Sequence, residues 1–239
     1  MTRSLEGASV VVIGGSSGIG LATARRAQEA GARVTIVGRD EARLASARED
    51  LGDGVGSFAL DVADEGGVAA LFDSLDSVDH VVNLAGTHVA GTLADLDTAA
   101  MRGPVDNRFW GAIFVCKYAA PKMAAGSITL CTGAGIARPR AGASIVAAAA
   151  GGSEVLARAM AQELKPIRVN VIRPGIIDTP LLDRMAGDHR DEMIASQAKR
   201  IPVGRIGQPE DIAHAIEFLM TNEFVTGTVL TVDGGHSIA

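Results

Sequence analysis

Short apolar runs alternate with longer stretches of helical spacing along nearly the whole chain. Because a continuous β-branched run such as Val10–Ile13 is typical of a strand buried on both faces, we expect a parallel sheet. Strict alternation of strand and helix predicts right-handed βαβ units and an α/β fold with helices on both faces of the sheet. The predicted strands are residues 8–13, 33–37, 55–60, 78–84, 127–131, 168–172 and 228–232. The predicted helices are residues 18–30, 40–51, 65–74, 104–124, 143–164 and 209–220.

Length and composition narrow the class of protein. No linker or low-complexity segment divides the 239 residues, so we expect a single domain over residues 1–239, in which 181–200 form a helical insertion that covers the substrate. The net charge of −6 and the lack of a basic run argue against nucleic-acid binding. Two cysteines, no apolar signal segment and no membrane-length run favour a cytoplasmic protein, and we predict no metal site.

The stretch Val10–Gly20 carries the first functional signal. A buried strand breaks into Gly14-Gly15-Ser16-Ser17-Gly18-Ile19-Gly20, and a helical pattern follows. Glycines there let backbone N–H groups approach an anion, and the helix N-terminus adds the positive end of its dipole. The pattern predicts a Rossmann-type, doubly wound parallel sheet of about seven strands with a dinucleotide at the carboxyl ends of its strands.

Five motifs in sequence order resemble the short-chain dehydrogenase/reductase family along nearly the whole chain. The glycine turn is similar to the family's TGxxxGxG, with Ile13 in the threonine position, and Asn83-Leu84-Ala85-Gly86 resembles its NNAG. Residues 204–211 and 227–235 resemble the family's last helix and last strand. The resemblance implies cofactor contacts from the glycine turn, from an adenine-reading pair, from the NNAG-like turn and from a PGxxxT segment that holds the nicotinamide. These residues are Gly14, Ser16, Ser17, Gly18, Ile19, Gly20, Asp61, Val62, Asn83, Ala85, Gly86, Pro174, Gly175, Ile177 and Thr179.

The end of the second strand predicts the cofactor. Family members that use NAD usually carry an acidic residue there, which binds the ribose 2′-hydroxyl. This chain has Gly38 followed by Arg39, and a guanidinium suits a 2′-phosphate through forked, charge-assisted hydrogen bonds. We therefore expect NADP(H) to be favoured over NAD(H).

The catalytic positions of the family are altered. Ungapped alignment places Gly133, Val146 and Ala150 where the family has serine, tyrosine and lysine, and Arg108 where it has asparagine. The only tyrosine, Tyr118, lies on the preceding helix, and no lysine occurs between Lys122 and Lys165. Because valine and alanine cannot donate a proton, the family's usual tyrosine mechanism is excluded.

Other residues are candidates for the missing chemistry. Arg108 is placed to stabilise an oxyanion or to bind an anionic substrate, although it could equally be a structural partner of a nearby carbonyl or carboxylate. Thr132 and Ser144 flank the emptied positions and carry hydroxyls, for which capping or turn bonding is the competing explanation. His88 follows the NNAG-like turn and titrates near neutral pH, while a surface-loop histidine is the competing explanation.

Three functions fit these observations. The first is an NADP(H)-dependent oxidoreductase with a non-standard active site, which reduces a small-molecule carbonyl or activated double bond. The second is a catalytically silent NADP(H)-binding sensor or partner protein, and the third is a non-redox cyclase or lyase. The family resemblance implies a homodimer or homotetramer, and the glycines Gly151 and Gly152 in a predicted helix suggest a close contact between subunits.

Overall fold

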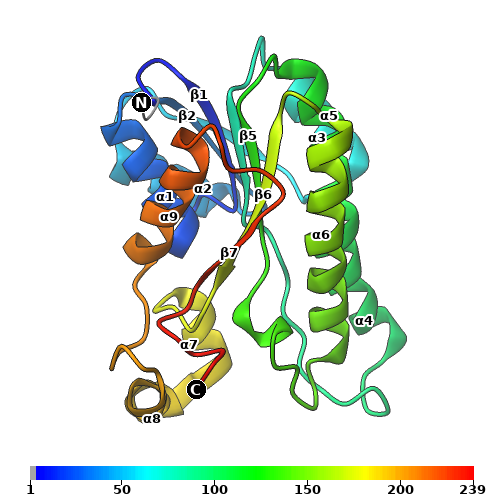
Figure 1. Cartoon of the computed structure of the whole chain (residues 1–239), viewed down its shortest axis with the longest axis vertical. Coiled ribbons are helices and arrows are strands. Elements are labelled where there is room, and N and C mark those ends of the chain that lie inside the picture. The colour runs from blue at the N-terminus through cyan, green and yellow to red at the C-terminus, as the bar shows by residue number, and fades with distance from the viewer. Residues whose placement is uncertain (1–3) are drawn as a thin grey trace.

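Parallel strands form one sheet, in the order β3-β2-β1-β4-β5-β6-β7, in the computed structural model, which describes residues 4–239 (Figure 1). Every neighbouring pair of strands in this order is parallel, and Val12, for example, lies opposite both Ile36 and Val82. The predicted fold class is confirmed. The strands are β1 (Ser9–Ile13), β2 (Arg33–Gly38), β3 (Gly56–Ala59), β4 (His80–Asn83), β5 (Ser127–Cys131), β6 (Arg168–Pro174) and β7 (Val229–Val232).

Two helical layers cover the sheet, one on each face (Figure 1). Successive side chains of β1 point to opposite faces of the sheet and pack against both helical layers. Val11 and Ile13 belong to one hydrophobic cluster, and Val10 and Val12 belong to the other. Helices α3, α5 and α6 pack on the first face, and α1, α2 and α9 on the second. The helices are α1 (Gly18–Glu29), α2 (Glu41–Leu51), α3 (Glu65–Asp73), α4 (Thr98–Pro104), α5 (Gly111–Ala119), α6 (Ser144–Glu163), α7 (Pro180–Ala186), α8 (Arg190–Arg200) and α9 (Pro209–Thr221).

The helix predicted over residues 104–124 is wrong in its bounds and its regularity. Helical structure begins earlier, at α4, widens into a π-turn over Val105–Trp110, and continues as α5 and a 3-10 turn over Ala120–Lys122. Pro104 and Pro121 lack the backbone N–H that a regular helix needs, and they stand where the helix changes form. The π-turn matters because it carries both Asn107 and Arg108.

Other boundaries differ by a few residues. The strands predicted at 55–60 and 78–84 are shorter, and the segment predicted as one helical insertion at 181–200 contains α7 and α8. Gly187, at a positive φ of 52°, separates these two helices. Within residues 4–239, no helix is both long and apolar enough to cross a membrane.

Packing within this single chain explains the two adjacent glycines of α6, Gly151 and Gly152. A Cβ on Gly152 would lie 3.0 Å from the ring of Phe109 in the π-turn, and one on Gly151 would lie 3.8 Å from Ile136. Gly152 therefore allows α6 to pack closely on the π-turn. The inference that both glycines mark a contact between subunits is not required, although the predicted oligomer itself stays a prediction.

Candidate active site

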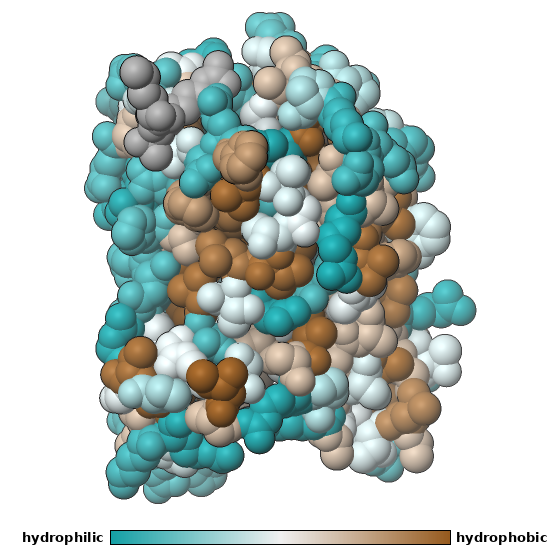
Figure 2. Space-filling view, in the orientation of Figure 1, coloured by the Kyte–Doolittle hydropathy of each residue, from teal (hydrophilic) through white to brown (hydrophobic). Residues whose placement is uncertain are grey.

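One large cleft of about 1480 Å³ opens at the carboxyl ends of the strands. Its walls come from the β1–α1 turn, the ends of β2, β4, β5 and β6, the first turns of α6, and helices α7 and α8. Hydrophobic side chains run along α6 and across β7 on the face drawn in Figure 2, whereas the end of the molecule that carries α8 is largely hydrophilic.

The β1–α1 turn has the geometry that a dinucleotide phosphate needs. Gly18 has a positive φ of 51°, which disfavours any residue with a Cβ. A Cβ on Gly20 would lie 2.0 Å from the carbonyl oxygen of Gly14, so no side chain fits at that position. The turn leads directly into α1, whose first backbone N–H groups lack helical partners and are available to an anion. These residues fit a nicotinamide dinucleotide.

Nearly all the predicted cofactor residues line the cleft. Fifteen of the sixteen do so: Gly14, Ser16, Ser17, Gly18, Ile19, Gly20, Arg39, Asp61, Val62, Ala85, Gly86, Pro174, Gly175, Ile177 and Thr179. Asn83 is the exception, since it is buried and its Oδ1 accepts a hydrogen bond from Ala85 N at 3.2 Å. Its side chain shapes the turn that carries Ala85 and Gly86.

The adenine end of the cleft holds a small polar network. Asp61 Oδ1 accepts hydrogen bonds from Asn107 Nδ2 at 2.9 Å and from Ala63 N at 3.0 Å, while Arg39 Nη1 lies 3.6 Å from Asp61 Oδ2. Arg43 also lines this end, with its Nε 3.3 Å from Asp40 Oδ2. Arg43 lies in the first turn of α2, and no motif in the sequence pointed to it.

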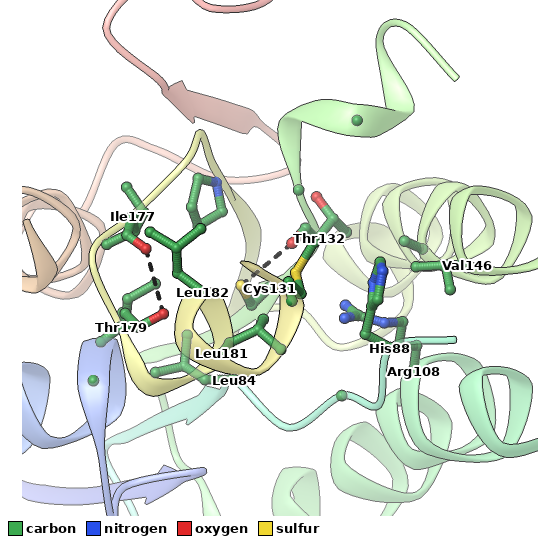
Figure 3. Close-up of a pocket in the computed structure, with 18 of the residues that line it drawn as sticks. Leu84, His88, Arg108, Cys131, Thr132, Val146, Ile177, Thr179, Leu181 and Leu182 are labelled. Carbon is green, nitrogen blue, oxygen red and sulfur yellow. Dashed lines mark hydrogen bonds between the residues drawn. The ribbon is translucent and has the colours of Figure 1, made fainter. Parts of the chain in front are cut away.

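The segment Pro174–Thr179, which is expected to hold the nicotinamide, is supported by residues outside the cleft. Ile177 pairs with Gly207 in an isolated parallel bridge, through hydrogen bonds of 2.9 Å from Gly207 N to Ile176 O and from Asp178 N to Gly207 O. The hydroxyl of Thr179 approaches Ile177 O at 3.4 Å (Figure 3). The PGxxxT-like segment is thereby held against the loop before α9.

The positions that the resemblance assigns to the family's serine, tyrosine and lysine line the cleft. Gly133, Val146 and Ala150 all line it, and none of the three carries a group that can give up a proton. Tyr118 is not among the lining residues, and its hydroxyl donates to Glu65 Oε1 at 2.9 Å on α3. The chain's only tyrosine therefore cannot substitute from another element.

Arg108 projects from the π-turn into the cleft. Its Nε donates to Thr87 O at 3.1 Å, and a Cβ on Gly86 would lie 2.7 Å from Arg108 Cζ, so the guanidinium lies against the Gly86 backbone. Among the residues that the structure describes, neither terminal nitrogen has a hydrogen-bond or ion-pair partner. Burial lowers the pKa of Arg108, against a smaller opposing effect of Cys131, but arginine stays protonated at neutral pH. The cleft therefore contains a cation with two donor groups left for a ligand.

His88 and Cys131 lie beside this cation (Figure 3). Burial lowers the pKa of His88, and the charge of Arg108 lowers it further, so the imidazole is neutral at pH 7. Burial raises the pKa of Cys131 to about 11, with Arg108 acting in the opposite direction, so the thiol stays protonated. Arg108 is the charged group of this part of the cleft.

The two candidate hydroxyls differ in their surroundings. Thr132 lines the cleft, but its Oγ1 donates to Glu154 Oε1 at 3.0 Å. Arg173 binds the same carboxylate in a fork, from Nε to Oε1 at 2.9 Å and from Nη2 to Oε2 at 2.6 Å. Ser144 is exposed at the start of α6 and is not among the lining residues. The geometry favours a structural role for Thr132, as part of a network that ties the ends of β5 and β6 to α6.

Comparison with known proteins gives the family. The family model described as "Enoyl-(Acyl carrier protein) reductase" matches residues 13–237. The chain is similar to the 3-oxoacyl-[acyl-carrier-protein] reductase of Homo sapiens, with 34% identity over 94% of this chain and 95% of that protein. It is 38% identical to the cis-4-hydroxycyclohexanecarboxylate dehydrogenase of Sinomonas cyclohexanicum, over 95% of both chains.

Solved structures agree with the sequence comparison. A small-chain dehydrogenase in complex with NADPH matches with a TM-score of 0.83 and 31% identity, over 98% of this chain and all of that one. The MalC reductase/Diels-Alderase from Malbranchea aurantiaca matches with a TM-score of 0.93 and 31% identity, over 99% of this chain and all of that one. The fold and the cleft are those of a nicotinamide-dependent oxidoreductase class. The chain belongs to the short-chain dehydrogenase/reductase family.

Proposed function

We propose that this protein is an NADP(H)-dependent oxidoreductase that reduces a small-molecule carbonyl or activated double bond without the family's tyrosine and lysine. The observation that carries the proposal is the partly buried guanidinium of Arg108. Its terminal nitrogens lack protein partners within residues 4–239, and it lies in the same cleft as the glycine turn that would hold the dinucleotide phosphates. The oxidoreductases among the family's relatives support the same class of reaction.

The cofactor, when bound, supplies the hydride. The chain's own residues then have separable tasks. Gly14–Gly20 would hold the phosphates, and the segment ending at Thr179 would orient the nicotinamide. Arg108 donates its terminal N–H groups to the oxygen on which negative charge develops, since preorganised donors are worth most in a water-poor cleft. The proton that completes the reduction would be taken up from bulk solvent, because the thiol of Cys131, with a pKa raised to about 11, is a weak acid at neutral pH.

The preference for NADP(H) rests on charge at the adenine end. Arg39 and Arg43 both line that end, and a 2′-phosphate would accept hydrogen bonds from guanidinium groups more strongly than a hydroxyl would. The carboxylate of Asp61 is held by Asn107 and by a backbone N–H, which leaves the two arginines as the groups that can turn toward the ribose.

A substrate screen tests the proposal. NADPH oxidation is followed with a panel of ketones, aldehydes and activated alkenes, first with the wild-type protein and then with Arg108→Ala. Loss of an oxyanion-binding donor should lower turnover about 100-fold or more. Arg102→Ala, on α4 outside the cleft, is the matched control and should leave turnover unchanged. Unchanged turnover in Arg108→Ala would refute the role of Arg108, and NADPH binding without turnover of any compound would favour the silent sensor or partner.

A second candidate function is a cyclisation that uses the cleft without hydride transfer. It is favoured by the similarity to MalC, which is named as both a reductase and a Diels-Alderase, together with the absence of an ionisable side chain at Gly133, Val146 and Ala150. Product formation by protein freed of nicotinamide cofactor would distinguish this function from the first.

Self-association is also part of the proposal. Several large apolar side chains are exposed on the single chain, namely Trp110, Val155, Phe218 and Phe224. We expect a homodimer or homotetramer in the cytoplasm, and a sedimentation experiment that finds only monomer at micromolar concentration would refute the association.

A further inference from the structure

Charge is distributed very unevenly along the cleft. Of its lining residues, Arg39 and Arg43 face the two carboxylates Asp40 and Asp61 at the adenine end. The rest of the lining contains no carboxylate side chain, although the whole chain has a net charge of −6. That part holds five arginines, Arg108, Arg138, Arg140, Arg184 and Arg200.

Three of these arginines form a cluster at the outer end of the cleft, around His236. Arg138 and Arg140 come from the connection between β5 and α6, and Arg200 is the last residue of α8. Figure 1 shows both segments at the end of the molecule where the C-terminus lies. Burial lowers the pKa of His236, and the charges of Arg140, Arg200 and Arg138 lower it further while Asp233 opposes them. All three arginines and His236 line the same cleft.

The protein neutralises this cluster only in part. Arg138 donates to a terminal oxygen of Ala239, the last residue of the sequence, and Asp233 is the carboxylate that acts on His236. Within residues 4–239, Arg140 and Arg200 have neither a hydrogen-bond nor an ion-pair partner. Like charges that are only partly neutralised raise the local concentration of anions and favour their binding. The outer end of the cleft is therefore a region in which an anionic group would be stabilised.

The lining that this cluster shares with Arg108 also contains large apolar side chains. It includes Ile136, Val146, Leu181, Met185 and Met193. Gln197 also lines it, and its buried Oε1 has no hydrogen-bond donor. An apolar wall with a few polar groups at its ends is the usual design of a small-molecule site, in which the polar groups fix the orientation of the ligand.

The geometry points to an amphiphilic anion as the substrate: a carboxylate or phosphate ester binds Arg138, Arg140 and Arg200, and the apolar body extends inward so that the reacting group reaches Arg108. This inference rests on the proposed function, because it names the substrate of that reaction. It assigns two separate tasks to the arginines of the cleft. The outer three select and orient the substrate, and Arg108 acts on the reacting oxygen.

Two fluorescent probes that differ in charge test the inference. 8-Anilinonaphthalene-1-sulfonate is an amphiphilic anion, and N-phenyl-1-naphthylamine is its uncharged parent. Both are titrated into wild-type protein, into Arg140→Gln/Arg200→Gln, and into the control Arg33→Gln/Arg158→Gln, which removes two positive charges from exposed positions outside the cleft. Each titration is repeated with NADPH present.

We expect the cleft double variant to bind the sulfonate at least tenfold more weakly and to bind the uncharged probe within twofold of wild type. The control should bind both probes within twofold of wild type. Equal losses for the two probes, no loss for the sulfonate, or complete displacement of the sulfonate by NADPH would overturn the inference. Failure of the proposed function is measured separately, since a protein that binds no NADPH can still show the charge-selective loss.

Discussion

The two halves of the cleft are built in different ways. In the cofactor half, the decisive features belong to the backbone: a turn in which Gly20 has no room for a Cβ, and a segment at Ile177 that is bridged to Gly207. In the catalytic half, the decisive features are side chains, and those at 133, 146 and 150 carry no group that ionises. The glycine turn of the first half matches what the family resemblance implies for cofactor binding, whereas the positions that the resemblance assigns to proton donors hold glycine, valine and alanine.

If the proposed function holds, binding a dinucleotide and donating a proton are physically separable. A backbone turn tolerates almost no substitution, because each change meets steric limits. A catalytic side chain can be replaced without damage to the fold, provided that its volume is acceptable, and Gly133 illustrates this because a Cβ built on it meets no atom within 4 Å. New chemistry can therefore arise in one half while the other half stays fixed.

The largest expected effect tests the rigidity of the cofactor half. In Gly20→Ala, the new Cβ would meet Gly14 O, so the turn must open and NADPH affinity should fall by at least about 4 kcal/mol. Calorimetric titration measures this loss. Gly135→Ala, in the catalytic half, is the control, because a Cβ there has open space and binding should be unchanged. Normal NADPH binding by Gly20→Ala would remove the contrast between the halves.

The second-largest expected effect is on the free energy of unfolding, and it concerns the network of Thr132, Glu154 and Arg173. Glu154→Gln leaves the partly buried guanidinium of Arg173 without its counter-charge, and the free energy of unfolding should fall by about 3 kcal/mol. Thr132→Val removes one hydrogen bond to the same carboxylate and should cost only about 1 kcal/mol. Denaturant unfolding of both variants gives the comparison. A larger loss for Thr132→Val would mean that the hydroxyl does more than support Glu154.

A smaller effect tests cofactor choice. Arg39→Ala should weaken NADPH binding by about 1.5–3 kcal/mol, through loss of charged hydrogen bonds to the 2′-phosphate, and should leave NADH binding unchanged. Arg43→Ala is the informative companion, since Arg43 lines the same end of the cleft and should share part of the effect. Equal losses for NADPH and NADH in Arg39→Ala would show that Arg39 does not contact the 2′-phosphate.

The smallest effect lies outside both halves, at the loop that braces the nicotinamide segment. Hydrogen bonds from Arg205 lower the pKa of Asp211 to about 2. A carboxyl with a depressed folded-state pKa stabilises the protein above its unfolded pKa of about 4, and that contribution is lost as the pH falls toward 2. Because Arg205 is more than half exposed, Asp211→Asn should cost under about 1 kcal/mol at pH 7. Thermal unfolding from pH 7 to pH 2 should show the difference from wild type shrinking with acidity, and a difference that grows would contradict this account.

The sequence predicted most of the cofactor half and little of the other. Glycine spacing and strand-end polar residues report backbone geometry directly, which is why fifteen predicted residues line the cleft. Asn83, which is predicted to bind the cofactor, is not among the lining residues, and its Oδ1 accepts a hydrogen bond from Ala85 N. The Glu154–Arg173 pair and the cluster of Arg138, Arg140 and Arg200 could not be predicted, because their members are distant in sequence and meet only through the packing of β5, β6, α6 and α8. The π-turn that carries Arg108 could not be predicted either, because the sequence pattern there is that of one continuous helix.

The central claim is that the cofactor half remains functional while the catalytic half has changed. Calorimetric titration of the wild-type protein with NADPH and with NADH, in the absence of substrate, tests this claim most directly. The account predicts measurable binding of NADPH and binding of NADH that is at least about tenfold weaker. Absence of binding for both cofactors would contradict it, and would leave only a function that does not use the dinucleotide turn.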